Sequence, residues 1–288
     1  MTNEKVLIIG GGVGPMAGVA LHARIIENTL SGGSDQGHFD VRHFSRSADI
    51  TDRTEYLLGR QTINPADGMA RTIGMAAAGL GGCDAVVGVP CNTFHAPAVF
   101  RSFTEQVASI ARTAGVSLLV LDMLAETMAY LKLALPGTET TEARGTVGTG
   151  VTRTEQSNPV AIGVLSTTGT RRSGVYGQLL AGAGLSALYV DEADQAVLHA
   201  AIYDPVWGIK ATGQPGTQAT ETLRALAVKL ADRGARAIIL GCTELPLALT
   251  ESHICGIPLV DPVLALARAM IREAAPAKLA PLPSTPGA

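Results

Sequence analysis

The sequence predicts an α/β fold built on parallel sheets. Short runs rich in Val, Ile and Leu recur along the chain, each followed by a turn of glycine or small polar residues and then by a longer, alanine-rich segment. Near-continuous apolar strands separated by crossover helices are typical of parallel sheets that are covered on both faces. The chain has 288 residues, 47% hydrophobic and 16% charged, so it can bury a large core and is long enough for about two domains.

Each strand is expected where an apolar run is unbroken, and each helix where the segment after the turn is rich in Ala and Leu. The expected strands are residues 6–9, 85–89, 117–121, 160–165, 237–240 and 258–260. The expected helices are residues 16–30, 96–114 and 124–135, a segment ending near 183, a segment after 243, and 263–274.

The same order of motifs occurs twice along the chain. The first half reads LIIGGGVG, then VVGVPCNTF, then LVLDMLAETMA; the second reads AIGVLSTTG, then IILGCTELP, then PLVDPVLALARA. Gly14 and Gly169 are 155 positions apart, and Cys91 and Cys242 are 151 apart. Three matches in the same order indicate an internal duplication and therefore two halves of similar architecture.

Charge and hydropathy exclude several classes of partner. The 22 Lys and Arg residues and the 25 Asp and Glu residues are interspersed, and the net charge of −3 predicts no surface for nucleic acid or an anionic membrane. The apolar runs are far shorter than a membrane span of about 20 residues. Because residues 1–5 carry no visible secretory signal, a cytoplasmic location is expected.

Two segments look less ordered than the rest. The polar stretch 136–159 has almost no apolar residues, so we expect an exposed loop, with a lid over the site as the alternative. The tail 275–288 contains four prolines and is expected to be disordered or loosely draped.

The glycine-rich turn at residues 10–14 suggests a phosphate-binding loop but departs from the dinucleotide fingerprint. The third glycine of G-x-G-x-x-G is out of register, and Pro15 lacks the N–H that would face a pyrophosphate. No GxxxxGK[ST] motif is present in the sequence either. We therefore interpret these glycines as shaping a tight turn or a close approach to the backbone.

Two of the four cysteines follow apolar strands and precede helices. Cys91 and Cys242 are expected at the carboxyl ends of parallel strands, where ligands bind and where helix N-termini favour a thiolate. Cys83 and Cys255 precede their strands and are interpreted as buried small residues or inert thiols. The sequence has no CxxC or HxxxH spacing for a metal. One thiol from each half suits proton removal from one face of a carbon and proton return to the other.

Five segments carry a resemblance to a known family. They are GGVGPMAG (11–18), PCNTFH (90–95), LSTTGTRRSGVYG (165–177), AIYDPVWGIKATG (201–213) and GCTELPL (241–247). Together they resemble the cofactor-independent aspartate/glutamate racemase family over nearly the whole chain, and its aspartate racemase branch in particular. Glutamate racemases of the cell-wall pathway typically have histidine at the position of Glu244.

The resemblance implies two Rossmann-like, parallel-sheet domains related by pseudo-twofold symmetry, with the active site in the cleft between them. Each half lends its closing unit to the other, so residues 1–117 plus 258–288 are expected to form the first domain and 118–257 the second. The resemblance also implies a homodimer that uses no cofactor and no metal.

The resemblance also assigns site residues. Cys91 and Cys242 match the family's acid/base pair. The residues that match substrate-binding positions are Arg53, Asn92, Thr93, Thr167, Lys210 and Thr243. Glu244 is expected to cap a helix or to orient a neighbour, and His95 to be a packed or supporting residue.

The expected activity is PLP-independent racemisation of an acidic amino acid, with aspartate as the expected substrate, by two-base proton transfer at Cα. Three alternatives stay open at this point. They are a racemase of glutamate or of a non-acidic amino acid, a related isomerase such as a maleate isomerase, and a small-ligand binder that has lost the chemistry.

Overall fold

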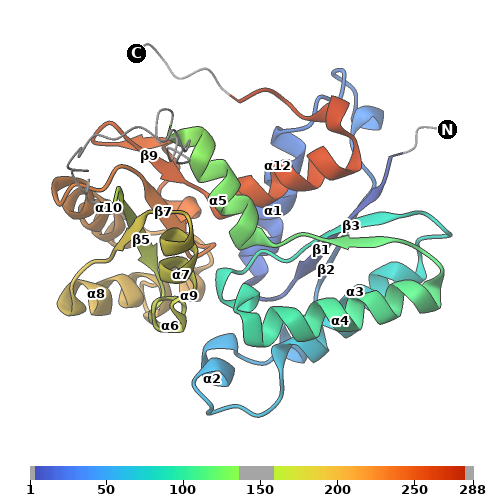
Figure 1. Cartoon of the computed structure of the whole chain (residues 1–288), viewed down its shortest axis with the longest axis horizontal. Coiled ribbons are helices and arrows are strands. Elements are labelled where there is room, and N and C mark those ends of the chain that lie inside the picture. Colours follow the sequence, from blue (N-terminus) through green and yellow to red (C-terminus); the bar gives the residue numbers. More distant parts are fainter. Residues whose placement is uncertain (1–3, 136–158, 283–288) are drawn as a thin grey trace, which may run out of the picture.

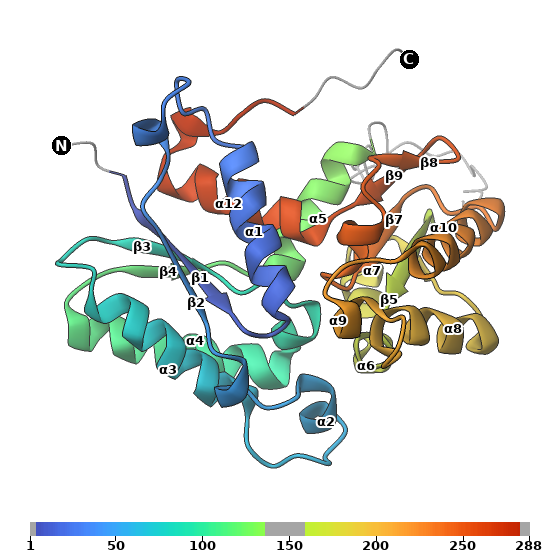
Figure 2. The same cartoon turned by 180° about the vertical axis from the view of Figure 1, so that it is seen from behind.

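The computed structural model describes residues 4–135 and 159–282, and in these residues the strands form two sheets (Figures 1 and 2). The first sheet has the order β2-β1-β3-β4, with β1 (Val6–Gly11), β2 (Val41–Ser45), β3 (Ala85–Gly88) and β4 (Leu118–Val120). The second has the order β6-β5-β7-β9-β8, with β5 (Ala161–Ser166), β6 (Ser186–Leu188), β7 (Ile238–Gly241), β8 (His253–Ile254) and β9 (Ile257–Val260).

The two sheets share one topology. Within each sheet the strand pairs are parallel, except for the hairpin of β8 and β9. If the short β8 is set aside, the strand that comes first in each half lies between the second and the third, and the fourth follows the third. This confirms the predicted parallel α/β fold in two similar halves.

Three strands were not predicted from the sequence, namely β2, β6 and β8. All three lie at the edges of their sheets, and the residues of β2 and β6 are mostly half-buried. An edge strand faces solvent in part, so its sequence lacks the unbroken apolar run that marks a central strand of a parallel sheet.

The first sheet is covered by two pairs of helices. Helices α1 (Pro15–Glu27) and α12 (Pro262–Ala274) pack on the face to which Leu7 and Ile9 point. Helices α3 (Pro65–Ala78) and α4 (Pro97–Ala114) pack on the opposite face, against Val6 and Ile8 (Figure 2). The alternation along β1 therefore divides its side chains between two cores.

The second sheet is covered in the same way. Helices α5 (Met123–Ala134) and α7 (Val175–Gly182) pack on the face that contains Val164 and Ile239. Helices α8 (Glu192–Tyr203) and α10 (Thr217–Asp232) pack on the other, against Leu165 and Leu240. The shorter helices are α2 (Arg53–Leu57), α6 (Thr168–Ser173), α9 (Ile209–Thr212) and α11 (Leu245–Ala248), with 3-10 turns at Asp35–Gly37, Ser47–Asp49, Asn92–His95 and Pro276–Lys278.

The chain crosses between the two sheets twice, and each crossing comes after a strand. Strand β4 pairs in the first sheet, but α5 packs on the second; β9 pairs in the second sheet, but α12 packs on the first. The expected boundaries therefore put residues 118–120 and 258–260 with the wrong sheet, because the helices are exchanged and the strands are not. We propose a first domain of 4–120 plus 261–282 and a second of 121–260.

The remaining expectations concern the two less ordered segments and the membrane. Of the loop expected at residues 136–159, residues 136–158 lie outside the residues that the structure describes. The tail is ordered as far as it is described: Leu279 forms an antiparallel bridge with Thr29, and Arg268 donates a hydrogen bond to the carbonyl of Ala280. No helix within the described residues is long and apolar enough to cross a membrane.

Candidate active site

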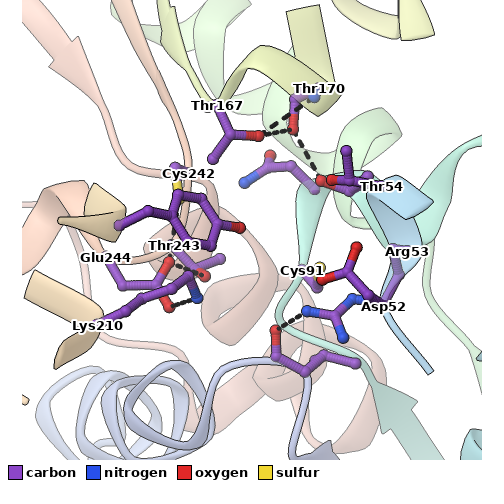
Figure 3. Close-up of a pocket in the computed structure, with 15 residues that line it drawn as sticks. Asp52, Arg53, Thr54, Cys91, Thr167, Thr170, Lys210, Cys242, Thr243 and Glu244 are labelled. Atoms are coloured by element: carbon purple, nitrogen blue, oxygen red, sulfur yellow. Dashed lines mark hydrogen bonds and ion pairs between the residues drawn. The ribbon is translucent and has the colours of Figure 1, made fainter. Parts of the chain in front are cut away.

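A small cavity lies between the two halves, at the carboxyl ends of the central strands (Figure 3). Its volume is about 20 Å³. The residues that line it are Val13, Asp52, Arg53, Thr54, Cys91, Asn92, Thr93, Thr167, Thr170, Tyr203, Lys210, Gly241, Cys242, Thr243 and Glu244. Every residue that the sequence singled out as catalytic or substrate-binding is among them.

The two cavity thiols come from equivalent places in the two halves. Cys91 follows β3 and precedes the 3-10 turn at Asn92–His95, while Cys242 follows β7 and precedes α11. Each residue is 7% exposed. In Figure 3, Cys91 lies on one wall with Arg53, and Cys242 lies on the other with Glu244 and Lys210. The strand ends therefore bring the thiols to one cavity from opposite sides.

Arg53 is oriented by backbone carbonyls. It begins α2, which Asp52 caps by accepting a hydrogen bond from the amide of Glu55 at 2.9 Å. Its Nη2 donates to the carbonyl of Val13 at 2.9 Å and its Nη1 to that of Thr51 at 3.3 Å. Its Nε is buried and makes no hydrogen bond with any described residue. The guanidinium is thus held from two sides by two of its five N–H groups, and the Nε–H is among those left for a ligand.

The charge of Arg53 is maintained in this buried place. Burial lowers the pKa of the guanidinium, but the nearby Cys91, Asp52 and Tyr203 outweigh that effect, and the pKa lies above its ordinary value. The glycine-rich turn therefore contributes a carbonyl that holds a cation, which is a different role from binding a phosphate.

A buried carboxylate joins the second thiol to a lysine. Lys210 Nζ donates a short hydrogen bond to Glu244 Oε1, and Cys242 Sγ donates to Glu244 Oε2 at 3.0 Å. Burial raises the pKa of the Cys242 thiol, and the negative charge of Glu244 raises it further. Burial lowers the pKa of Lys210, but Glu244 outweighs this effect and raises it above its ordinary value. Cys242 is therefore held as a thiol here.

The conformation of the glycine turn makes room for this ion pair. Gly14 has φ of +146°, and a Cβ at this position would lie 2.7 Å from Glu244 Oε1 and 3.3 Å from Lys210 Nζ. Only glycine tolerates both that backbone conformation and that close approach. The interpretation of the turn from the sequence agrees with this contact.

Polar side chains close the cavity between the two thiols. Tyr176 donates a short hydrogen bond to Asn92 Oδ1, and Asn92 Nδ2 is buried without a hydrogen-bond partner in the described residues. The hydroxyls of Thr93 and Thr170 share a hydrogen bond of 2.8 Å, and those of Thr167 and Thr170 share one of 3.1 Å. The cavity therefore offers an amide donor and several hydroxyls to a polar ligand.

Sequence reasoning missed several cavity residues. Thr54 follows Arg53 directly, and Thr170 lies in the same turn as Thr167. Tyr203 ends α8, and its ring lies 5.5 Å from Lys210 Nζ. The signal for Tyr203 was present, because it belongs to the AIYDPVWGIKATG segment, seven residues before Lys210.

The sequence analysis also gave expectations for Cys83, Cys255, Glu244 and His95. Cys83 and Cys255 lie outside the cavity and are exposed, so the first of their two interpretations, buried small residues, was wrong, and the second, inert thiols, stays a prediction. Glu244 precedes α11 without a side-chain capping hydrogen bond, so of its two expected roles only that of contacting a neighbour agrees with the geometry. His95 is buried, and its Nδ1 lies 2.9 Å from the carbonyl oxygen of Cys91. Among the described residues, no group of three or more His, Cys, Asp or Glu could hold a metal ion.

Comparison with known proteins gives one family model that matches part of the chain and one shared fold. The family model for Asp/Glu/hydantoin racemases matches residues 147–270. An aspartate racemase from Picrophilus torridus is 23% identical, with a TM-score of 0.68 over 93% of each chain. A putative Asp/Glu racemase from Yersinia pestis is 20% identical, with a TM-score of 0.63 over 94% of this chain and 99% of that one. A Francisella tularensis glutamate racemase in complex with D-glutamate is 16% identical, with a TM-score of 0.58 over 99% and 86%.

Proposed function

We propose that this chain is a member of the Asp/Glu/hydantoin racemase family, whose model matches residues 147–270, and that it racemises free aspartate without a cofactor, with Cys91 and Cys242 as the two acid/base residues. The proposal makes the chain an isomerase. One observation carries the proposal: two thiols, one from each half, line the same cavity and approach it from opposite walls (Figure 3).

The chemistry requires one thiolate and one thiol. The thiolate takes the α-hydrogen as a proton, and the electron pair of the C–H bond stays on Cα. The thiol on the opposite face then gives its proton to Cα, so the configuration inverts and the two sulfurs exchange protonation states. The reverse reaction starts from the exchanged state.

The carbanion needs electrostatic stabilisation, because the α-hydrogen of an amino acid is very weakly acidic. Asn92 Nδ2 and the hydroxyls of Thr93 and Thr167 are the donors that the cavity offers to the α-carboxylate, and Thr243, whose hydroxyl donates to Glu244 Oε2, lines the cavity beside them. The cavity walls exclude bulk water, which strengthens each of these interactions.

Two cations on opposite walls support a dicarboxylic substrate. Arg53 offers its free Nε on the Cys91 side, and Lys210 lies on the Cys242 side. A planar guanidinium and a point-charged ammonium together offset the cost of desolvating two carboxylates. The similarity in fold to an aspartate racemase agrees with aspartate as this substrate.

The test is solvent exchange at Cα. We expect the chain to convert L- into D-aspartate in D₂O with one deuterium incorporated at Cα, as followed by chiral chromatography and mass spectrometry. Cys91→Ala and Cys242→Ala should each abolish interconversion, whereas Cys83→Ser, which changes an exposed cysteine outside the cavity, should leave it intact. Normal racemisation of aspartate by Cys242→Ala would exclude the two-base scheme. A panel of other amino acids in the same assay tests the substrate.

The proposal extends to a homodimer in the cytoplasm. Its support is the resemblance to the family, and exposed apolar side chains on α1 agree with a partner surface. Val19 is 50% exposed and Ile26 is 49% exposed, and they lie two turns apart on that helix.

A further inference from the structure

The two cavity thiols have different neighbours. Glu244 is 3% exposed and accepts hydrogen bonds from Lys210, from Cys242 at 3.0 Å and from Thr243 at 3.3 Å. No described carboxylate forms such a hydrogen bond with Cys91, whose charged neighbour is Arg53. One buried carboxylate thus connects the cation of one cavity wall to the thiol of the same wall.

Lys210 acts on both members of this pair: its charge lowers the pKa of Cys242 directly, and its contact with Oε1 stabilises the carboxylate of Glu244. While the ammonium contacts Oε1, the negative charge of Glu244 is stabilised, and the thiol at Oε2 keeps its proton. A cation in contact with Oε1 stabilises the carboxylate more than it stabilises a thiolate on the far side of that carboxylate. Removing the cation from Glu244 therefore shifts the shared proton from sulfur towards oxygen.

Lys210 is also within reach of a ligand. It lines the cavity beside Glu244, its side chain is 24% exposed, and α9, which bears it, is a single turn. A ligand carboxylate that enters the cavity competes with Glu244 for the same ammonium.

We propose that Glu244 is a substrate-gated proton acceptor for Cys242: a carboxylate of the bound substrate takes over Lys210, and the released Glu244 then accepts the thiol proton. The S–H bond breaks, its electron pair stays on sulfur, and an O–H bond forms on Oε2, so the total charge of the pair is unchanged. Glu244 acts on Cys242 and not on the substrate, so it is a positioning residue. This inference rests on the proposed function, because that function supplies the carboxylate that reaches Lys210.

The gate has a consequence for the free protein. Without a diacid in the cavity, Cys242 stays protonated and unreactive, and the thiolate forms only when a substrate is in place. Cys91, beside Arg53, does not depend on this exchange.

The rate at which iodoacetamide alkylates Cys242 in Lys210→Met distinguishes the proposed gate from a simple electrostatic effect of the lysine on the thiol. If Lys210 were only a nearby cation that stabilises a thiolate, its removal would slow alkylation by iodoacetamide. If it restrains Glu244, its removal should speed alkylation at pH 7 by about tenfold, which corresponds to one pKa unit. In the double variant Lys210→Met/Glu244→Gln, which has no carboxylate to accept the thiol proton, the rate should be lower than in Lys210→Met.

The same samples contain the controls. Peptide mass spectrometry of the full chain reports each cysteine separately: the exposed Cys83 and Cys255 report the reagent, and Cys91 reports any widening of the cavity. A Cys242 rate that is unchanged or lower in Lys210→Met, or equally raised in the double variant, overturns the proposal.

Succinate, a diacid without an ammonium group, tests the gating step in the wild type. Bound succinate, with its binding followed by calorimetry, should raise the ultraviolet absorbance of thiolate in the wild type and not in Glu244→Gln. Binding without this rise overturns the gate and leaves the proposed function standing. Absence of binding counts against the diacid site of the proposed function, and with it against the gate.

Discussion

The amide of Asn92 shows how single hydrogen bonds prepare the cavity. Its Oδ1 accepts from Tyr176, a fully buried residue of α7, so the Nδ2 end, which has no hydrogen-bond partner among the described residues, is left for the cavity. Asn92 belongs to the first half and Tyr176 to the second. The donor expected to hold the α-carboxylate is therefore oriented from across the boundary between the halves.

We expect Tyr176→Phe to affect both stability and activity. The change leaves Asn92 Oδ1 buried without its donor, which costs about 1–3 kcal/mol. The amide also loses its fixed orientation, so kcat/KM for aspartate should fall about tenfold, the equivalent of 1.4 kcal/mol. Urea unfolding and the racemisation assay measure the two effects. Tyr130→Phe, a change outside the cavity, is the matched control, and a Tyr176→Phe protein that matches it in both assays would contradict this role.

At the scale of elements, the two exchanged helices begin alike. Asp122 caps α5 by accepting from the amides of Leu124 and Ala125, and Asp261 caps α12 by accepting from those of Val263 and Leu264. These are the Leu-Asp and Val-Asp pairs that the duplicated motifs share. Each helix therefore starts directly after its strand, at the point where the chain passes to the other sheet.

The Asp261 cap should make stability depend on pH in a defined direction. Burial raises the pKa of its carboxyl in the folded state, although Arg24 opposes this effect. A raised folded pKa means that ionisation is harder in the folded state, so the free energy of unfolding falls as the pH rises from the unfolded value of about 3.9 through the folded pKa. Asp261→Asn keeps the capping oxygen and removes this dependence.

We therefore expect Asp261→Asn to gain stability relative to the wild type as the pH rises through this window. Asp261→Ala, which loses the cap, should be less stable by about 1 kcal/mol than Asp261→Asn at every pH. Urea unfolding at acid and neutral pH measures both differences. An advantage of Asp261→Asn that shrinks with rising pH would show that Arg24 outweighs burial.

The short elements mark the limit of prediction from the sequence. The central strands and long helices have unbroken apolar or periodic sequences, so their places and the two cavity cysteines at strand ends could be predicted. Thr54 and Thr170 reach the cavity through α2 and α6, of five and six residues. The position of such a short helix depends on tertiary contacts, which no local pattern encodes.

The exchange of helices is a property of the whole molecule. The family resemblance implied that each closing strand moves to the other domain together with its helix, which puts each crossing before a strand. Packing separates the two: α12 covers Leu7 and Ile9 of the first sheet, although its own strand pairs with β7. Which sheet a helix covers depends on complementary surfaces far apart in the sequence, so this boundary could be found only in the structure.

The halves also meet across the cavity, and these contacts restrict it. The hydroxyls of Thr93 and Thr170 are hydrogen-bonded between the halves, and Gly169 of α6 lies against Thr54 of α2. A cavity of about 20 Å³ has room for about one water molecule. We therefore expect the halves to separate for substrate entry and to close again around the substrate, with the two cavity thiols aligned only in the closed form.

Gly169→Ala should hinder that closure. A Cβ on Gly169 would lie 2.2 Å from Thr54 Oγ1, a distance at which α6 or α2 must shift. We expect kcat/KM for aspartate to fall at least about tenfold, since an error of 1 Å in position can cost more than this. Gly182→Ala, in α7 with no heavy atom within 4 Å of the added Cβ, is the matched control and should leave kcat/KM unchanged. Thr54→Ala in the Gly169→Ala background removes the two closest clashing atoms and leaves only Cβ, at 2.9 Å, so activity should recover in part. Full activity of Gly169→Ala would mean that the two halves need not meet at this contact during turnover.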